Sequence, residues 1–447
     1  MNQNTNILNY KPLKVIVAYI ILTILLTFIG PVKYKDYSYG TMLVFMSFVI
    51  LAIVIGYISS ASLYNKNQKH INVKVESYFM KGNTVDLLII ISIFITLTFE
   101  FLTLVSYINS ISELNLNTLI YRMQSIGDIY KSSLIAAKES TDVNILRQFI
   151  TLLGIFKQIA IIGYLFRKEK LKKFRFLFWG IIVLNLINIF AFKGTQKELG
   201  DLIIYFSSVW LIKKGISRKI KLYKVVIPMI IISITVFGFM QLSRANTYSM
   251  DISNYETVFF IFDSNHIVYK LFGEKIGYAI TVVTHYVSGG YYGLTKSLVV
   301  PFQWTYGLGN SFALSSYATQ YFGIDYMILH SIPFRAEVIT GYPAFMYWST
   351  IFPWLASDLS FPGCIAFMFV IARLYGLVWR ETIYNKNLIS ALLFTRLNIM
   401  WLFLPANNQL MQTRESAIAT IVLFLFWLLF HNKFSTKSTN MEVLHKI

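Results

Sequence analysis

Residues 39–63, YGTMLVFMSFVILAIVIGYISSASL, form 25 consecutive positions without a charged side chain. A helix needs about 20 apolar residues to cross the hydrocarbon core of a bilayer, so this stretch predicts a transmembrane helix. Similar runs recur along the whole chain. The runs that predict spans are residues 15–32, 39–63, 87–108, 149–166, 176–192, 199–212, 225–242, 359–379, 388–404 and 416–430. The sequence therefore predicts an all-α, polytopic integral membrane protein with about 10–12 transmembrane helices.

The composition excludes other classes of protein. Hydrophobic residues make up 56 % of the 447 residues and charged residues only 14 %, whereas a soluble domain carries about 25 % charged residues. So few charges cannot cover a water-facing surface, which excludes a soluble enzyme with one membrane anchor. The high hydrophobicity excludes a disordered chain. The single cysteine, Cys364, excludes a disulfide framework and a CxxC metal site, and we expect no metal and no cofactor.

The formal net charge of +19 is concentrated on one side of the predicted bilayer. When the N-terminus is placed in the cytoplasm, the inner loops and termini carry 23 Lys and Arg against 4 Asp and Glu. The outer loops carry 13 Lys and Arg against 14 Asp and Glu. This asymmetry obeys the positive-inside rule and predicts that both termini are cytoplasmic. The basic inner loops then face anionic lipid, and nucleic acid is not an expected partner.

Charges inside the predicted spans are few. Glu100 and Lys157 lie in the third and fourth spans. Because a charge at bilayer depth is costly unless it is paired or functional, we expect these two residues to form an ion pair.

The spans are unevenly distributed within a single polytopic domain, residues 1–447. The sequence predicts N-terminal spans in 1–175, central spans with a basic outer hairpin in 176–243, a large external loop in 244–345, C-terminal spans in 346–431 and a cytoplasmic tail in 432–447. Residues 277–300 and 342–356 are apolar but interrupted by Gly, Pro, His or Lys, so we expect short or re-entrant helices there. No internal repeat is evident, which argues against an inverted-repeat transporter.

Basic residues at predicted outer positions are candidates for binding a diphosphate. The hairpin FKGTQKE at residues 192–198 places Lys193 and Lys197 four positions apart, on one face if helical. Lysines are disfavoured in outer loops, so topology alone does not explain this pair. Arg244 follows the seventh span at its outer end, and Arg414 lies in the outer turn 405–415. For Arg244 the alternative is an arginine at a helix end that only extends toward water.

The predicted external loop is rich in aromatic residues. His285, Tyr291, Tyr292, Trp304 and Tyr306 are candidates for glycan contacts, because aromatic rings pack against the apolar faces of sugars. The alternative is an aromatic belt at the membrane interface. For His285 the alternative is a structural histidine in an apolar stretch.

Four residues are candidates for proton transfer and charge stabilisation. His330, Arg335 and Glu337 bring an imidazole, a guanidinium and a carboxylate into eight positions. A plain surface pair of Arg335 and Glu337 is the alternative. Asp358, at the outer end of the eighth span, is the fourth candidate, and capping of the following helix is its alternative role.

The absence of several motifs limits the reactions that this chain could catalyse. The chain contains no GxxxxGK[ST] or GxGxxG nucleotide-binding motif and no GxSxG serine elbow. A membrane enzyme without a nucleotide must take an activated substrate, and a lipid-linked diphosphate sugar is such a donor. Departure of the lipid diphosphate needs positive charge in a preorganised pocket, and the acceptor hydroxyl needs a base.

The order of these features resembles the Wzy-type O-antigen and oligosaccharide repeat-unit polymerases of bacterial inner membranes. The resemblance covers residues 176–430 and consists of the basic hairpin, Arg244 at the end of the next span, and a large external loop before the last spans. Within this region, YVSGGYYGL (286–294), WTYG (304–307) and ASDLSFPG (356–363) are similar to stretches of that family. Family hairpins often carry Arg where this chain has Lys193, Gln196 and Lys197.

The resemblance implies an all-helical, metal-independent glycosyltransferase with the fold of the O-antigen ligases. It would polymerise undecaprenyl-diphosphate-linked oligosaccharide repeats at the periplasmic face, passing the growing glycan from its lipid diphosphate to the non-reducing end of a new lipid-linked repeat. The expected partners are that lipid-linked oligosaccharide, membrane lipid and a chain-length regulator protein. The alternatives are an O-antigen ligase, a lipid-linked oligosaccharide flippase or other transporter, and a structural assembly subunit.

Overall fold

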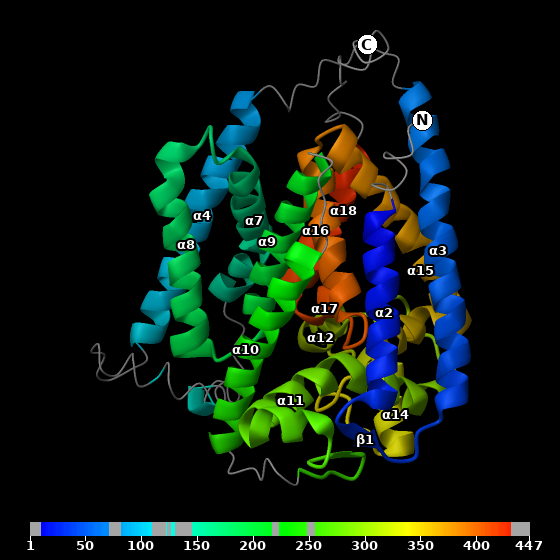
Figure 1. The fold of residues 1–447 in the computed structure, drawn as a ribbon. Helices are drawn as coiled ribbons and strands as arrows, with labels where there is room; N and C mark the ends of the chain where they lie inside the picture. Colours follow the sequence, from blue (N-terminus) through cyan, green and yellow to red (C-terminus); the bar gives the residue numbers. More distant parts are fainter. Residues whose placement is uncertain are drawn as a thin grey trace.

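The computed structural model describes residues 10–70, 82–109, 122, 127–129, 145–216, 223–247 and 255–430. The described part is a bundle of long helices that stand side by side, with shorter helices and a small sheet at one end (Figure 1). The long helices are α2 (Lys11–Ile29), α3 (Tyr39–His70), α4 (Gly82–Asn109), α7 (Ile145–Arg167), α8 (Arg175–Ile187), α9 (Lys197–Ile216), α10 (Tyr223–Thr247), α15 (Phe352–Tyr384), α16 (Leu388–Phe403) and α18 (Arg414–Phe430). The expectation of a predominantly helical chain is confirmed.

Each of the predicted spans overlaps one of these helices. In the described part, 5 helices are long and apolar enough to cross a membrane by length and composition: Lys11–Ile29, Tyr39–Ser62, Asn83–Ile108, Lys172–Lys193 and Phe352–Tyr384. Their outer faces carry exposed aliphatic side chains, such as Ile29 at 66 %, Val44 at 60 % and Leu87 at 56 % exposure. Water would penalise an apolar surface of this extent, so the architecture is that of a membrane protein.

Small residues allow the long helices to pack closely. A Cβ on Gly56 of α3 would lie 2.2 Å from the carbonyl oxygen of Phe369 in α15. One on Gly376 of α15 would lie 2.2 Å from Oγ of Ser60 in α3. These two contacts explain how α3 and α15 lie side by side over most of their length, because only a missing side chain lets the backbones approach this far.

Residues 255–345 fold at the end of the bundle where α2 ends (Figure 1). Their elements are β2 (Phe260–Phe262), α11 (Ile267–Leu298), α12 (Phe312–Phe322), α13 (Tyr326–Leu329) and α14 (Ile332–Thr340). α11 lies across this end of the bundle and breaks at Gly273, where φ is +75°. It includes most of the predicted helical segment 277–300.

One feature was not predicted from sequence. β1 (Val32–Tyr34) pairs antiparallel with β2, with Lys33 opposite Ile261. The sequence predicts helices throughout, and this small sheet is the correction. Its two strands come from distant parts of the chain and pair only where the fold brings them together. Each strand has three residues, so no local sequence pattern predicts it.

α15 is longer than the predicted eighth span and is broken near its start. The break is at Ser360, whose φ is 62°. Pro362 follows two residues later and cannot donate a backbone hydrogen bond to Asp358, so the helix is interrupted there. The predicted segment 342–356 joins α15 only from Phe352 onward. This break places Asp358 at the end of the first short helical segment.

Candidate functional site

The turn between α8 and α9 is held by two arginines. α8 continues into a π-helical turn, η2 (Asn188–Lys193), and Gly194 follows with a φ of 60°, a left-handed conformation that suits glycine. Arg244, near the end of α10, donates from Nη2 to the Gly194 carbonyl at 2.8 Å. Arg122 donates from Nε to the Ala191 carbonyl at 2.9 Å. These two bonds fix the positions of both guanidinium groups beside the turn.

Two lysines flank the same turn. Nζ of Lys193 lies 2.6 Å from Oε1 of Glu198, an ion pair within the hairpin. Nζ of Lys197 donates to the hydroxyl of Thr413 at 2.9 Å, which links the hairpin to the start of α18. Three predicted diphosphate residues therefore meet at one turn. We name residues 193–198, with Arg122 and Arg244, the basic hairpin.

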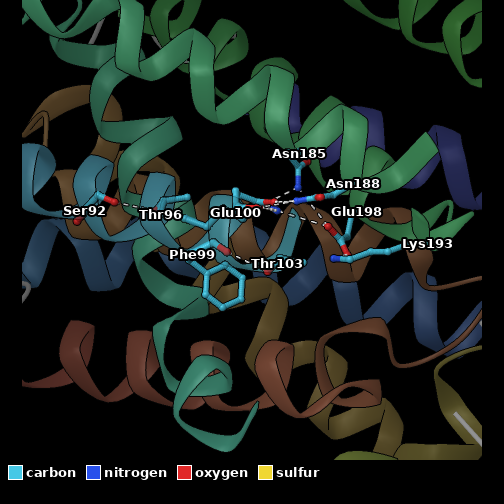
Figure 2. Close-up of polar contacts among 10 residues, drawn as sticks. Ser92, Thr96, Phe99, Glu100, Thr103, Asn185, Asn188, Lys193 and Glu198 are labelled. Carbon is cyan, nitrogen blue, oxygen red and sulfur yellow. Dashed lines mark hydrogen bonds and ion pairs between the residues drawn. The ribbon is translucent and has the colours of Figure 1, made fainter. Parts of the chain in front are cut away.

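A buried polar cluster supports the basic hairpin from inside the bundle (Figure 2). Glu100 of α4 is 1 % exposed. Its Oε1 accepts from Lys157 at 2.8 Å and from Asn185 at 2.9 Å, and its Oε2 accepts from Asn188 at 2.8 Å. Asn185 also donates to Glu198 at 3.2 Å. The predicted Glu100–Lys157 ion pair is confirmed, and the cluster ties the hairpin to α4 and α7.

An amide on the basic hairpin has an unused donor. Gln196 is 7 % exposed, and its Nε2 has no hydrogen-bond partner among the described residues. Its Oε1 accepts from Gln241 at 3.3 Å, and Gln241 also donates to the hydroxyl of Tyr286 at 3.1 Å. A buried donor without a partner costs about 1–3 kcal/mol, so this amide favours an acceptor-rich ligand at the hairpin.

His330 lies between α13 and α14 and stacks on Tyr326, with 3.9 Å between ring centroids. Its Nδ1 lies 2.9 Å from the carbonyl oxygen of Tyr326. Because a carbonyl only accepts, Nδ1 carries the hydrogen, and the neutral imidazole keeps a lone pair on Nε2. This tautomer is able to take a proton at Nε2, the chemistry expected of a general base.

The hydrogen bonds of Arg335 and Glu337 go to backbone groups and not to His330. Arg335 donates from Nη1 to the Pro301 carbonyl at 2.8 Å, and Oε2 of Glu337 accepts from the backbone N–H of Ala344 at 3.0 Å. The two residues are two positions apart on α14, so they point to different sides of the helix. In the described part of the chain, no ion pair joins Arg335 to Glu337 and no hydrogen bond joins either residue to His330, so the proposed common role of the three stays a prediction. Both side chains bind backbone groups instead.

Asp358 accepts four hydrogen bonds from one loop. Oδ1 accepts from the hydroxyl of Thr305 at 2.6 Å and the N–H of Gly307 at 2.8 Å. Oδ2 accepts from the N–H and the side-chain amide of Asn310, both at 2.8 Å. A carboxylate offers about four acceptor sites, and all are used. This geometry favours a role in shaping residues 305–310 over the predicted proton transfer or helix capping.

The loop that Asp358 shapes presents two predicted glycan contacts. Trp304 is 54 % and Tyr306 58 % exposed, with 4.8 Å between their ring centroids. Tyr306 has a φ of 53°, a strained conformation for a residue with a Cβ, which the bonds to Asp358 on either side maintain. Its ring lies 5.7 Å from that of Tyr326, which stacks on His330. We name these four rings the aromatic strip.

The other three predicted glycan contacts lie in the interior. Tyr291 is 0 % and Tyr292 1 % exposed. His285 is partly buried, and its Nδ1 lies 3.1 Å from the hydroxyl of Tyr34 on β1. Burial lowers the pKa of His285 to about 4. These side chains pack α11 against β1 and α2, so a glycan has no access to the two tyrosines.

The predicted site residues thus form two groups, and Arg414 lies between them. Its guanidinium lies 4.3 Å from the ring centroid of Tyr317 in α12, and it donates to Gln320. Thr413, the neighbour of Arg414, binds Lys197 of the basic hairpin. Residues 413–414 therefore connect the basic hairpin with α12.

Sequence reasoning missed the residues that support the hairpin. Asn185 and Asn188 lie three positions apart in an apolar span, a spacing that places both on one helix face. Polar residues so placed are a signal of a buried network. Arg122 lies in the second predicted outer excursion, far from the hairpin in sequence, and no local pattern connects the two.

In the part of the chain that the structure describes, no group of three His, Cys, Asp or Glu side chains is placed to hold a metal ion. A scan of protein-family models and searches of curated proteins and of solved structures give no match to this chain. The function must therefore be argued from the arrangement of its own residues.

Proposed function

We propose that this chain is a membrane glycosyltransferase that polymerises undecaprenyl-diphosphate-linked oligosaccharide repeats at the outer, periplasmic face of a bacterial inner membrane. The growing glycan leaves its lipid diphosphate and passes to the non-reducing end of a new lipid-linked repeat. The observation that carries the proposal is the convergence of three cations, Lys197, Arg244 and Arg122, on one turn, which the two arginines hold through its backbone carbonyls and which Lys197 ties to Thr413.

The charge of the basic hairpin suits a lipid diphosphate as leaving group. The glycosidic bond breaks with negative charge developing on the diphosphate, and cations fixed in advance stabilise that charge. Lys197 and Arg244 are the residues proposed to contact the diphosphate. Lys193 is neutralised by Glu198, so it keeps the turn in shape. Gln196 offers a further buried donor to a phosphate oxygen.

The aromatic strip is proposed to receive the acceptor glycan. Trp304 and Tyr306 are exposed and adjacent, as packing against sugar rings requires. His330, at the end of the strip, has the tautomer that takes a proton at Nε2. It is therefore the proposed base for the acceptor hydroxyl, while Asp358 positions the loop.

The outer location follows from the charge distribution. The basic hairpin and the aromatic strip lie toward the end of the bundle opposite the start of α2. The positive-inside rule assigns that end to the outside, where finished lipid-linked repeats are polymerised.

The test is a polymerisation assay on purified protein in detergent, with undecaprenyl-diphosphate-linked repeats from the source cells, EDTA and no nucleotide. A ladder of glycan products on a gel is the expected result. Arg244→Ala and Lys197→Ala should each lower the rate about 10²-fold, the usual effect of losing one fixed donor to a developing anion. Lys270→Ala is the matched control, because Lys270 is exposed on α11 outside the hairpin and should leave the rate unchanged.

Absence of a ladder with the authentic repeat would contradict the proposal. One observation favours a second candidate, a lipid-linked oligosaccharide transporter: charged groups lie between α4, α7 and α9 inside the bundle. Transfer of the labelled lipid-linked repeat across a proteoliposome bilayer, without a ladder, would support this transporter. Transfer of glycan only to a lipid A-core acceptor would indicate a ligase.

A further inference from the structure

A cavity lies at the other end of the bundle, away from the basic hairpin. It has a volume of about 390 Å³. It is formed where α7 and α9 end and where the turn between α15 and α16 lies. The residues that line it include three cations, Arg167, Lys213 and Lys386, and no acid.

The charge around the cavity is not balanced. Arg167 lies 3.7 Å from Asp86, but Asp86 is also paired with Lys170. Lys213 donates to the neutral carbonyl of Leu165, and Lys386 is exposed. One carboxylate therefore serves two cations, and two further cations face the cavity without a carboxylate among their bonds in the described part.

Among the described residues, two further carboxylates at this end are engaged elsewhere. Glu169 lies on the surface between Lys168 at 3.8 Å and Lys172 at 3.3 Å. Glu381 is 5 % exposed, and its Oε2 accepts from Ser390 at 2.6 Å on the interior side. The cavity therefore favours an anion.

The backbone at Lys386 supports the same conclusion. Its φ is 51°, in the left-handed region that glycine adopts freely and lysine does not. A residue with a Cβ is strained in this conformation. The turn between α15 and α16 thus carries a lysine where a glycine would be relaxed, and such strain is a pointer to function.

The walls of the cavity are apolar. Phe166, Ile212 and Leu388 contribute to them, and Ile216 is 37 % exposed at the edge. A soluble phosphate would leave this apolar surface unused. A ligand with both an anionic group and hydrocarbon chains would satisfy the cations and the walls together.

We propose that this cavity binds the phosphate of an anionic membrane phospholipid, with Arg167, Lys213 and Lys386 around the headgroup and the acyl chains along Ile216 and Leu388. The position suits such a ligand, because the cations lie at the ends of membrane helices on the predicted cytoplasmic side. The site is independent of the proposed transferase activity, which is assigned to the opposite end.

The test is native mass spectrometry of protein released from nanodiscs that contain phosphatidylglycerol and phosphatidylcholine in equal amounts. The wild type should retain phosphatidylglycerol. Lys213→Gln and Lys386→Gln should each reduce the retained fraction about tenfold, the effect of losing about 1.4 kcal/mol of binding free energy. Lys168→Gln is the matched control: Lys168 is exposed at the same end and does not line the cavity, so retention should stay at the wild-type value.

Lys386→Gly separates binding from folding. Glycine relaxes the backbone at this position, so the melting temperature should not fall, yet retention of phosphatidylglycerol should be lost. Wild-type retention in both Lys386→Gly and Lys213→Gln would overturn the proposal. Equal reduction by Lys168→Gln would overturn it too, since it would indicate general attraction to the basic surface. Displacement of the lipid by equimolar glycerol 3-phosphate would show that the site takes soluble phosphate instead.

Discussion

At the scale of single residues, the buried carboxylate of Glu100 depends on its neighbours. It is 1 % exposed and accepts from Lys157, Asn185 and Asn188. Removing Lys157, the cation bonded to it, leaves a buried charge without that compensation, and such losses cost far more than the intact pair contributes.

We expect Lys157→Met to destabilise the protein by about 3–5 kcal/mol. Thermal unfolding in detergent, followed by circular dichroism, would measure the change. The double variant Glu100→Gln/Lys157→Met removes both charges and should recover most of the loss. A single variant as stable as the wild type would contradict the structural role of the pair.

His285 gives the protein a pH-dependent contact between α11 and β1. Burial lowers its pKa to about 4 from an ordinary value of 6.5. Between these two values the unfolded chain binds more protons than the folded one, so stability falls as the pH drops from 6.5 toward 4 and is unaffected by this group above 6.5.

The expected loss is at most about 3 kcal/mol, because one pKa unit corresponds to 1.36 kcal/mol. The measurement compares melting temperatures at pH 7.5 and pH 5 for the wild type and His285→Gln. The variant keeps a polar side chain but cannot titrate, so it should lose part of the pH dependence. An identical pH dependence in both proteins would argue against a buried neutral histidine.

At the scale of elements, α11 is positioned by glycines that permit contact with two loops. A Cβ on Gly290 would lie 1.8 Å from the carbonyl oxygen of Pro405, and one on Gly293 would lie 2.4 Å from that of Trp348. Both atoms that an added Cβ would clash with belong to the backbone, so they cannot move away by a change of rotamer.

Gly290→Ala should therefore destabilise the fold by about 1–3 kcal/mol, the usual effect of overpacking. Gly40→Ala is the matched control. A Cβ at Gly40 meets nothing within 4 Å, and alanine is the better residue in a helix, so its melting temperature should not decrease. A tolerated Gly290→Ala would mean that α11 and the loop at Pro405 are not in contact.

At the scale of the whole molecule, the proposed function requires that the end of the bundle with the basic hairpin faces the periplasm. The chain has a single cysteine, Cys364, which is 0 % exposed and should not react with a maleimide in the folded protein. Labelling of a variant with one introduced cysteine therefore reports on that cysteine and not on Cys364.

The cells are treated so that the outer membrane is permeable and the inner membrane stays intact. A maleimide that cannot cross the inner membrane should then label the cysteine of the Lys270→Cys variant but not that of the Lys168→Cys variant. Lys168 should become accessible only after the inner membrane is permeabilised, because it follows α7 at the end of the bundle predicted to be cytoplasmic. The reverse pattern would place the basic hairpin on the cytoplasmic side and would contradict an outer polymerisation site.

The sequence by itself determined the helical membrane architecture. Uncharged runs of span length have few alternatives in a folded chain, because backbone groups in a bilayer must be hydrogen-bonded within the segment. The same reasoning predicted the Glu100–Lys157 pair, since charges at bilayer depth need partners. It also placed Lys193, Lys197 and Arg244 in one group, because all three lie at the predicted outer ends of neighbouring spans.

Only the tertiary structure decided which of the other candidates face solvent and which face the core. Tyr291 and Trp304 are aromatic residues of the same loop, yet one is buried against Thr23 and the other is exposed. By sequence Asp358 is a candidate for proton transfer or helix capping, but in the structure it accepts four hydrogen bonds from residues 305–310. Arg122 reaches the hairpin from a distant segment. For these residues, exposure and hydrogen-bond partners are set by contacts between segments far apart in the chain, which their local sequence does not specify.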